Sequence, residues 1–176
     1  MGEGKKVLPI NMRELCWALD DSSLTVDRYV DLETGDIVEQ IEFDDIYYDD
    51  NGEKLEDPVS EMIEKDPDRF ECIDPLPSFE SYEHMEAFIL TVQDTHLKEL
   101  LAVAIDGKGA FRRFKDVLYR YPEEEYRWLR FKEQKMTEVA KEFLDSIGVE
   151  PAGDSRQDAD APDGGESRGT PEGPSP

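Results

Sequence analysis

The sequence has few of the residues that metal binding and thiol chemistry use most often. Its 176 residues include only two cysteines, Cys16 and Cys72, and two histidines, His84 and His96. The cysteines lack CxxC spacing and neither lies near a histidine, so the pattern argues against a zinc site and against a redox pair. Cys16 falls in an apolar helical pattern and Cys72 in a strand-like segment, so both are predicted to be buried free thiols.

Long apolar runs are also lacking. No stretch approaches the roughly 18–20 apolar residues that cross a bilayer. The first residues contain two lysines but no continuous apolar segment or small-residue cleavage site of a signal peptide. Myristoylation of Gly2 is not favoured, because Lys6 stands where that motif has Ser or Thr. We therefore expect a cytoplasmic protein that does not contact membranes.

The motifs of common enzyme classes are missing as well. There is no serine elbow, Walker A loop, dinucleotide fingerprint or HExxH, and Gly-Lys-Gly at 107–109 is too short for a P-loop. The acidic stretch 44–57 fails as an EF-hand, because placing Gly52 at loop position 6 puts Tyr47 at position 1. We expect a solvated loop there, and no cofactor or metal.

One polar cluster offers acid–base groups. Tyr82, Glu83, His84 and Glu86 fall close together, but nothing in the sequence positions a nucleophile or a second partner beside them. An enzyme using these residues is therefore the least favoured of the functional hypotheses.

The distribution of charge is the main electrostatic feature. The chain has 44 acidic and 20 basic residues, a formal charge of −24 that disfavours long-range attraction to nucleic acid. Between residues 106 and 142, however, ten basic residues stand against eight acidic ones. Half of all lysine and arginine thus falls in about a fifth of the chain.

Hydrophobic periodicity predicts a mixed first half. Residues 12–19 read as a helix that Asn11 can cap, and residues 24–32 and 37–43 read as two strands. Gly35 suits the tight connection between them, because glycine tolerates a positive φ. Residues 50–52 form a second turn signal, residues 58–65 a short helix, and residues 69–73 a further strand.

The second half is predicted to be helical. Two apolar stripes continue into a glycine-started helix at 107–118, and after Pro122 a long helix follows at 123–147. The stripes are Met85, Phe88, Ile89 and Val92, then Leu97, Leu100, Leu101 and Ala104, then Phe111, Phe114, Leu118 and Tyr121. The core face of the long helix is predicted to be Tyr126, Leu129, Met136, Ala140, Phe143 and Ile147.

These elements predict one α+β domain over residues 1–149. A small antiparallel sheet with short helices precedes a C-terminal set of about four helices packed on it. Residues 150–176 lose their apolar content and become acidic and rich in Gly, Pro and Ser, which predicts a disordered tail.

The glycine-started helix is the strongest candidate for function. The free N–H groups of a helix start hold anions, and nearby cations would add charge. The candidate anion or partner-binding residues there are Lys108, Gly109, Arg112, Arg113 and Lys115. The alternative is structural: the glycines join two helices and the arginines neutralise the acids of the first half. In the long helix, Trp128 and Phe131 beside Arg127 have the composition of a contact hot spot, or equally of a packed cluster.

Several segments together resemble a known bacterial family. They are YVDLETGDI at 29–37, RFECIDPLP at 69–77, YEHMEAFILTV at 82–92, GKGAFRRFKDVL at 107–118 and WLRF at 128–131. Their order and spacing are similar to those of uncharacterised protein family 0158, over roughly residues 10–148. Because that family has no assigned function, the resemblance implies a bacterial origin and a single domain but transfers no catalytic residues.

Two functional hypotheses follow. The leading one is a non-enzymatic interaction or regulatory protein that contacts an unknown protein partner through Arg112, Arg113, Lys115, Trp128 and Phe131. The alternative is binding of RNA, a nucleotide or phosphate by the basic and aromatic surface of residues 107–135, where local potential outweighs net charge within a Debye length.

Overall fold

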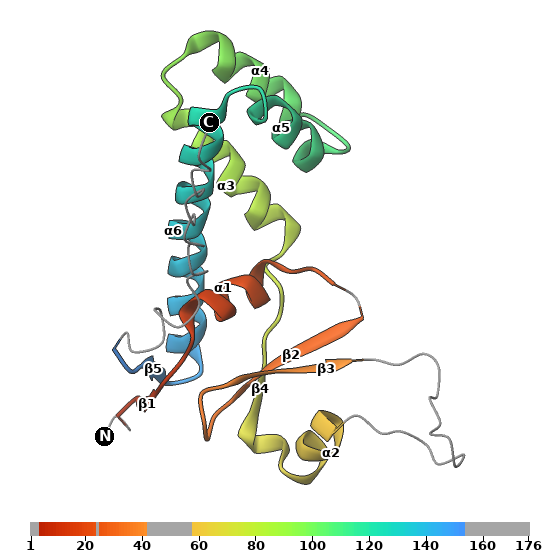
Figure 1. Ribbon diagram of the computed structural model, residues 1–176, viewed down its shortest axis with the longest axis vertical. Helices are drawn as coiled ribbons and strands as arrows, with labels where there is room; N and C mark the ends of the chain where they lie inside the picture. Colours follow the sequence, from red (N-terminus) through yellow and green to blue (C-terminus); the bar gives the residue numbers. More distant parts are fainter. Residues whose placement is uncertain (1–3, 24, 42–57, 154–176) are drawn as a thin grey trace, which may run out of the picture.

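A computed structural model describes residues 4–23, 25–41 and 58–153 of the chain, and one long helix connects its two ends. This helix, α6 (Pro122–Ser146), has 25 residues. Figure 1 shows α3 (Ser78–Thr91), α4 (Thr95–Ile105) and α5 (Ala110–Leu118) gathered around its first half. Helix α1 (Met12–Asp20) and the strands lie beside its second half. We call these regions the helical end and the sheet end.

The sheet end contains a three-stranded antiparallel sheet in the order β3–β2–β4. Strand β2 (Val26–Asp31) pairs with β3 (Ile37–Ile41) on one side and with β4 (Phe70–Cys72) on the other. Gly35 has a φ of 82° in the tight connection, as its sequence position predicts. Helix α2 (Pro58–Lys65) and the 3₁₀ helix η1 (Pro67–Arg69) lead into β4.

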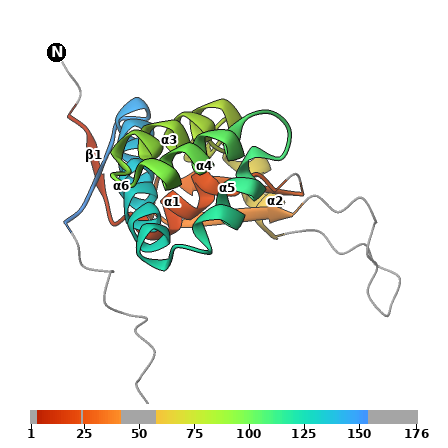
Figure 2. The ribbon, with the colours of Figure 1, turned by 90° about the horizontal axis from the view of Figure 1, so that it is seen from above.

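A second, parallel pair of strands was not predicted. Strand β1 (Lys6–Leu8) pairs with β5 (Val149–Pro151), so the two ends of the domain meet. Figure 2 shows this pair on one side of α6 and the three-stranded sheet on the other. The predicted tail begins at residue 150, but Glu150 and Pro151 belong to β5. Residues 154–176, the acidic stretch 44–57 and the turn predicted at 50–52 lie outside the described residues.

The core of the sheet end is aliphatic. Helices α1 and α6 pack against each other, and the Asn11 side chain accepts a hydrogen bond from the Glu14 amide, so the predicted cap is confirmed. Among the described residues, this core draws on α6 but not on α3, α4 or α5. Its buried members are Leu8, Ile10, Leu15, Ala18, Leu19, Val30, Ile73, Met136, Ala140, Leu144 and Val149.

The core of the helical end is largely aromatic. Asp94 caps α4 by accepting a hydrogen bond of 2.7 Å from the Leu97 amide, and the four predicted C-terminal helices are present. The buried members are Met85, Phe88, Ile89, Val92, Leu97, Leu101, Ile105, Ala110, Phe114, Leu118 and Trp128. Together with the antiparallel sheet, these helices confirm the α+β class, and α6 is the helix that joins the two cores.

The predicted core face of α6 is wrong in its first half. Tyr126 and Leu129 are exposed, whereas Trp128 is 8% exposed. Trp128, the buried residue near the start of α6, points about 120° away from Met136, Ala140 and Leu144, the residues buried near its end, as judged from the helical period. A single stripe drawn along the whole helix cannot describe a helix that serves two cores on different sides.

Four other burial predictions and one helix boundary also differ from the structure. Phe111 and Leu100 are exposed members of otherwise buried helical stripes, and helix α5 begins at Ala110 rather than at Gly107. Cys72 is exposed and Cys16 half-buried, although both are free thiols. Cys72 pairs with Tyr29 and is offset by one residue from Glu71, the partner of buried Val30. The register therefore directs Cys72 to the sheet face opposite the core.

Candidate functional site

The turn between α4 and α5 is built around two glycines and one arginine. Gly107 and Gly109 have φ values of 80° and 76°, a conformation that other residues rarely adopt. The Arg113 guanidinium donates hydrogen bonds to three backbone carbonyls of the turn: Ala104 at 2.9 Å, Lys108 at 2.5 Å, and Asp106. It thereby satisfies carbonyl groups that the end of a helix leaves without partners. Arg113 therefore has a structural role in this turn.

Arg127 also joins two helices. Its guanidinium donates to the Glu124 carboxylate at 2.5 and 2.7 Å and to the Thr91 hydroxyl at 2.8 Å. The same group lies 5.4 Å from the centre of the Phe88 ring. Arg127 thus holds the start of α6 against the end of α3, combining an ion pair with a cation–π contact.

The two aromatic candidates of α6 lie in the helical core. The Trp128 ring centre is 4.9 Å from that of Phe114 and 5.3 Å from that of Phe88, both in edge-on geometry. Phe131 is half-buried and stacks 6.2 Å from Trp128. The structure therefore removes Trp128 from the predicted contact surface and gives Phe131 a largely internal neighbourhood.

The remaining candidates do lie on the surface. Lys108, Gly109, Arg112 and Lys115 are exposed, and the Arg112 Nε atom is 3.8 Å from the Asp116 carboxylate. A Cβ atom added at Gly109 would meet no atom within 4 Å, so a ligand can approach this backbone. Of the predicted binding residues, these four are therefore exposed, whereas Trp128 is buried.

Two other aromatic side chains lie among these cations. Phe111 is 42% exposed and Tyr119 is 78% exposed. At 100° per residue, Phe111, Arg112, Lys115 and Tyr119 fall within about 100° of arc, next to the arc of buried Ala110, Phe114 and Leu118. We call these four residues the α5 outer face. Phe111 was assigned to the core because it is in phase with Phe114 and Leu118, which conceals its exposure.

The polar cluster around His84 takes part in helix packing. The Tyr82 hydroxyl donates to the Ile105 carbonyl at 3.1 Å, which joins α3 to α4. His84 is half-buried, and burial, together with the nearby Lys135 ammonium, lowers its pKa. Within residues 4–23, 25–41 and 58–153, no group of three or more His, Cys, Asp or Glu side chains is arranged to hold a metal ion.

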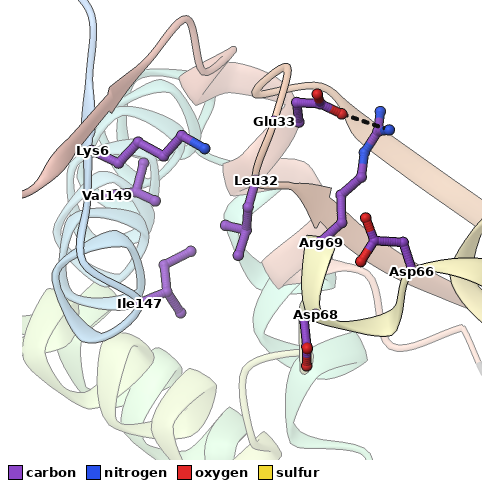
Figure 3. A pocket seen from close by; sticks show the side chains of 8 residues that line it. All are labelled: Lys6, Leu32, Glu33, Asp66, Asp68, Arg69, Ile147 and Val149. Atoms are coloured by element: carbon purple, nitrogen blue, oxygen red, sulfur yellow. Dashed lines mark ion pairs between the residues drawn. The ribbon is translucent and has the colours of Figure 1, made fainter.

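A cleft at the sheet end is a second candidate that sequence analysis missed. It has a volume of about 370 Å³ and lies where β1 and β5 approach the β2–β3 turn and η1 (Figure 3). Its walls come from segments far apart in the sequence, so no local motif marks it. The lining residues are Lys6, Leu32, Glu33, Asp66, Asp68, Arg69, Ile147 and Val149.

Arg69 is fixed at the edge of this cleft by two acids. It donates to both carboxylate oxygens of Asp31, at 2.8 and 2.5 Å, and forms an ion pair of 2.6 Å with Glu33. Asp31 is 3% exposed and also accepts a hydrogen bond from the Glu33 amide. The Arg69 hydrogen bonds lower the pKa of Asp31 to about 2, outweighing the opposing effect of burial.

Comparison with known proteins identifies a family without a known activity. The sequence model of the "Uncharacterised protein family (UPF0158)" matches residues 6–163. UPF0158 protein PA5073 of Pseudomonas aeruginosa is 28% identical over 145 residues, which cover 82% of this chain and 87% of that protein. No solved structure matches the chain significantly. None of the helices in the described ranges is long and apolar enough to cross a membrane.

Proposed function

Since the chain belongs to the uncharacterised protein family UPF0158, we propose that it is a non-enzymatic protein that binds a partner protein through the α5 outer face. The supporting observation is the exposure of Phe111 and Tyr119, at 42% and 78%, between cationic side chains. Aromatic residues next to arginine are the composition of binding hot spots. The other face of the same helix is buried, so these side chains have a rigid support.

The charges of this face indicate the chemistry of the partner. Lys108 and Lys115 form no ion pair with a described residue, and Arg112 has one long contact with Asp116. Three exposed cations around two aromatic rings fit a protein surface that presents acidic and apolar side chains. Nucleic acid is a poorer partner, because the net charge of −24 disfavours the approach of a polyanion.

The proposed setting is the cytoplasm of a bacterium. A bacterial relative and the two free cysteines support this setting, since reducing compartments keep thiols unpaired.

Site-specific photo-crosslinking tests the proposal. A photo-reactive amino acid at Tyr119 should crosslink one protein in bacterial cells, and the same group at Phe79, an aromatic position on α3 that is 64% exposed, should not. The captured protein, once purified, should bind the unmodified chain. The double variant Arg112→Glu, Lys115→Glu should weaken that binding by more than about tenfold, and added salt should weaken binding to the unmodified chain.

Three outcomes would overturn the proposal. They are equal crosslinking from positions 119 and 79, unchanged affinity of the doubly charge-reversed variant, and crosslinking of RNA in place of protein. The RNA result would favour the nucleic-acid alternative instead. Arg113 is not a suitable target, because its guanidinium holds the α4–α5 turn and its loss would disturb the fold.

A further inference from the structure

The cleft at the sheet end carries opposite charges on facing walls. Figure 3 shows the Lys6 ammonium group directed into the cleft from one wall and the Asp66 carboxylate directed into it from the other. Neither side chain forms an ion pair with another described residue, and Leu32 lies between them. Ile147 and Val149 extend the apolar surface beside Lys6. The cleft therefore presents two cations (Lys6 and Arg69), three acids (Glu33, Asp66 and Asp68) and an aliphatic floor, and of these charges Arg69 and Glu33 pair with each other.

The walls of this cleft are held by contacts of their own. Arg69 and Glu33 pair with each other at 2.6 Å, and buried Asp31 fixes Arg69 from behind. On the other wall, the pairing of β1 with β5 holds Lys6 beside Val149. The tight turn at Gly35 packs on Leu8 and Pro9, which brings the two walls together. Because these contacts already fix both walls, the cleft requires little conformational ordering when a ligand binds.

We propose that this cleft binds a small zwitterion with an aliphatic body, which is the chemistry of an aliphatic amino acid or a short aliphatic peptide. Its carboxylate would pair with Lys6 and its ammonium group with Asp66. Its side chain would cover Leu32, Ile147 and Val149. The volume of about 370 Å³ suits a ligand of this size, since small-molecule sites begin at about 300 Å³.

The mixed lining disfavours ligands of one charge. A phosphate or other anion would pair with Lys6 but would face Asp66, Asp68 and Glu33. A simple amine would pair with Asp66 but would face the Lys6 ammonium group and the Arg69 guanidinium, which already interacts with Asp66. A zwitterion can form an ion pair with each wall, and its apolar part displaces water from the aliphatic floor between them.

Methyl NMR on the full chain tests the proposal. Titration with leucine and with the dipeptide leucylleucine should shift the methyl signals of Leu32, Ile147 and Val149. The two ligands separate the two sources, because a free amino acid site responds to leucine and a peptide site responds to the dipeptide alone. N-acetylation of the responding ligand removes its positive charge, and amidation removes its negative charge. Each change should weaken binding by about tenfold.

Matched variants locate the two contacts. Lys6→Met and Asp66→Asn should each weaken binding by about tenfold. Lys5→Met is the control for the first, because the neighbouring lysine pairs with Asp145 at 2.6 Å and does not line the cleft. Asp27→Asn on β2 is the control for the second. Neither control should change the affinity.

Three results would overturn the inference. The methyl signals of the cleft do not respond to either ligand, the charge-blocked ligands bind as well as the parent compounds, or Lys6→Met and Asp66→Asn bind like the unmodified chain. None of these results bears on the α5 outer face, which lies at the helical end of the molecule.

Discussion

The two ends of this molecule bury their apolar side chains in different ways. The core of the helical end lies within residues 85–128 and is centred on aromatic rings. The core of the sheet end combines residues 8–30, Ile73 and residues 136–149, and it is closed by the parallel pairing of β1 with β5. One end thus depends on contacts that are local in the sequence, and the other on contacts between the two ends of the domain.

The two ends also differ in their polar contacts, which are buried at the sheet end and lie at the edge of the core at the helical end. The buried polar residues of the described chain, Arg28 and Asp31, both lie at the sheet end. Arg28 pairs with Asp21 at 2.7 Å and with Glu39 at 2.9 Å, and Asp31 pairs with Arg69. At the helical end, arginines cap carbonyls and cover rings at the edge of an apolar core. Acid should therefore affect the sheet end first, and cavities should affect the helical end most.

The largest expected effect is a cavity in the aromatic core. Phe88→Ala should lower the free energy of unfolding by about 4 kcal/mol, because Phe88 is 1% exposed and contacts Phe114, Trp128 and Phe131. Urea denaturation measures the loss. Phe79→Ala in the same helix is the control, since Phe79 is 64% exposed and its loss should change stability by less than about 1 kcal/mol.

Hydrogen exchange on Phe88→Ala would show how far the two ends are independent. The amides of α3, α4 and α5 should lose more protection than those of β2 and β3, because the two cores share only helix α6. A uniform loss across both ends would contradict this, and would show that α6 makes them one cooperative unit.

The next largest effect should come from the buried acid of the sheet end. Asp31→Asn should cost about 3 kcal/mol at neutral pH, because it removes the buried carboxylate that accepts two hydrogen bonds from Arg69. Asp27→Asn, an exposed position on the same strand, should cost less than about 0.5 kcal/mol. Equal losses at the two positions would show that the Asp31–Arg69 pair contributes nothing to stability.

The pH dependence of this effect has a definite sign. Folding lowers the pKa of Asp31 from 3.8 to about 2, so the ionised carboxylate stabilises the folded state above the ordinary pKa. That contribution is lost as the pH falls through about 2. The difference in the free energy of unfolding between the unmodified chain and Asp31→Asn should therefore narrow between about pH 4 and pH 2. A constant difference would contradict the assignment.

The same contrast explains which features could be predicted from sequence. The helices, the β2–β3 hairpin and the cap at Asn11 follow from local periodicity and side-chain chemistry, which act over a few residues. The β1–β5 pair could not be predicted, because three-residue strands at opposite ends of a domain carry no local signature. The cleft depends on that pair and was missed for the same reason.

The errors at the candidate site have a different physical cause. The basic character of residues 108–115 was visible in the composition, but whether each arginine meets carbonyls or solvent depends on the turn geometry. Arg112 and Arg113 are neighbours in sequence and both are exposed, yet Arg113 donates to the carbonyls at the end of α4 whereas Arg112 has one long contact with Asp116. Likewise, Trp128 was left out of the predicted core face of α6, with a contact surface and a packed cluster both open, because the helical stripe was extended from the sheet end, where α6 buries another side.

A smaller difference in stability should distinguish the β2–β3 turn of the sheet end from the α4–α5 turn of the helical end. Gly35→Ala should cost about 2 kcal/mol, since alanine is strained at a φ of 82° and its Cβ would lie 3.1 Å from Pro9 Cδ and 3.2 Å from Leu8 Cβ. Gly109→Ala meets the same backbone strain at a φ of 76° but open space, so it should cost about 1 kcal/mol. Thermal unfolding measures the loss of stability of each variant. Equal losses would show that the β2–β3 turn shifts to accommodate the added Cβ atom.

The smallest effect concerns Arg112 and Arg113, two neighbouring arginines of α5. Arg113→Met should lower the free energy of unfolding by about 1 kcal/mol, because three carbonyls of the α4–α5 turn lose a charged donor and must turn to water. Arg112→Met should change it by less than about 0.5 kcal/mol, because its ion pair is long and exposed. Urea denaturation of the two variants makes the comparison.

This pair of variants also brings the two ends of the molecule into one experiment. The carbonyls that Arg113 contacts do not titrate, so its loss should have the same cost at pH 4 and pH 7, whereas the cost of Asp31→Asn depends on pH. If Arg112→Met is the more destabilising change, Arg112 rather than Arg113 stabilises the fold. Arg112 would then be a structural residue, and the proposed partner surface of the α5 outer face would lack one of its cations.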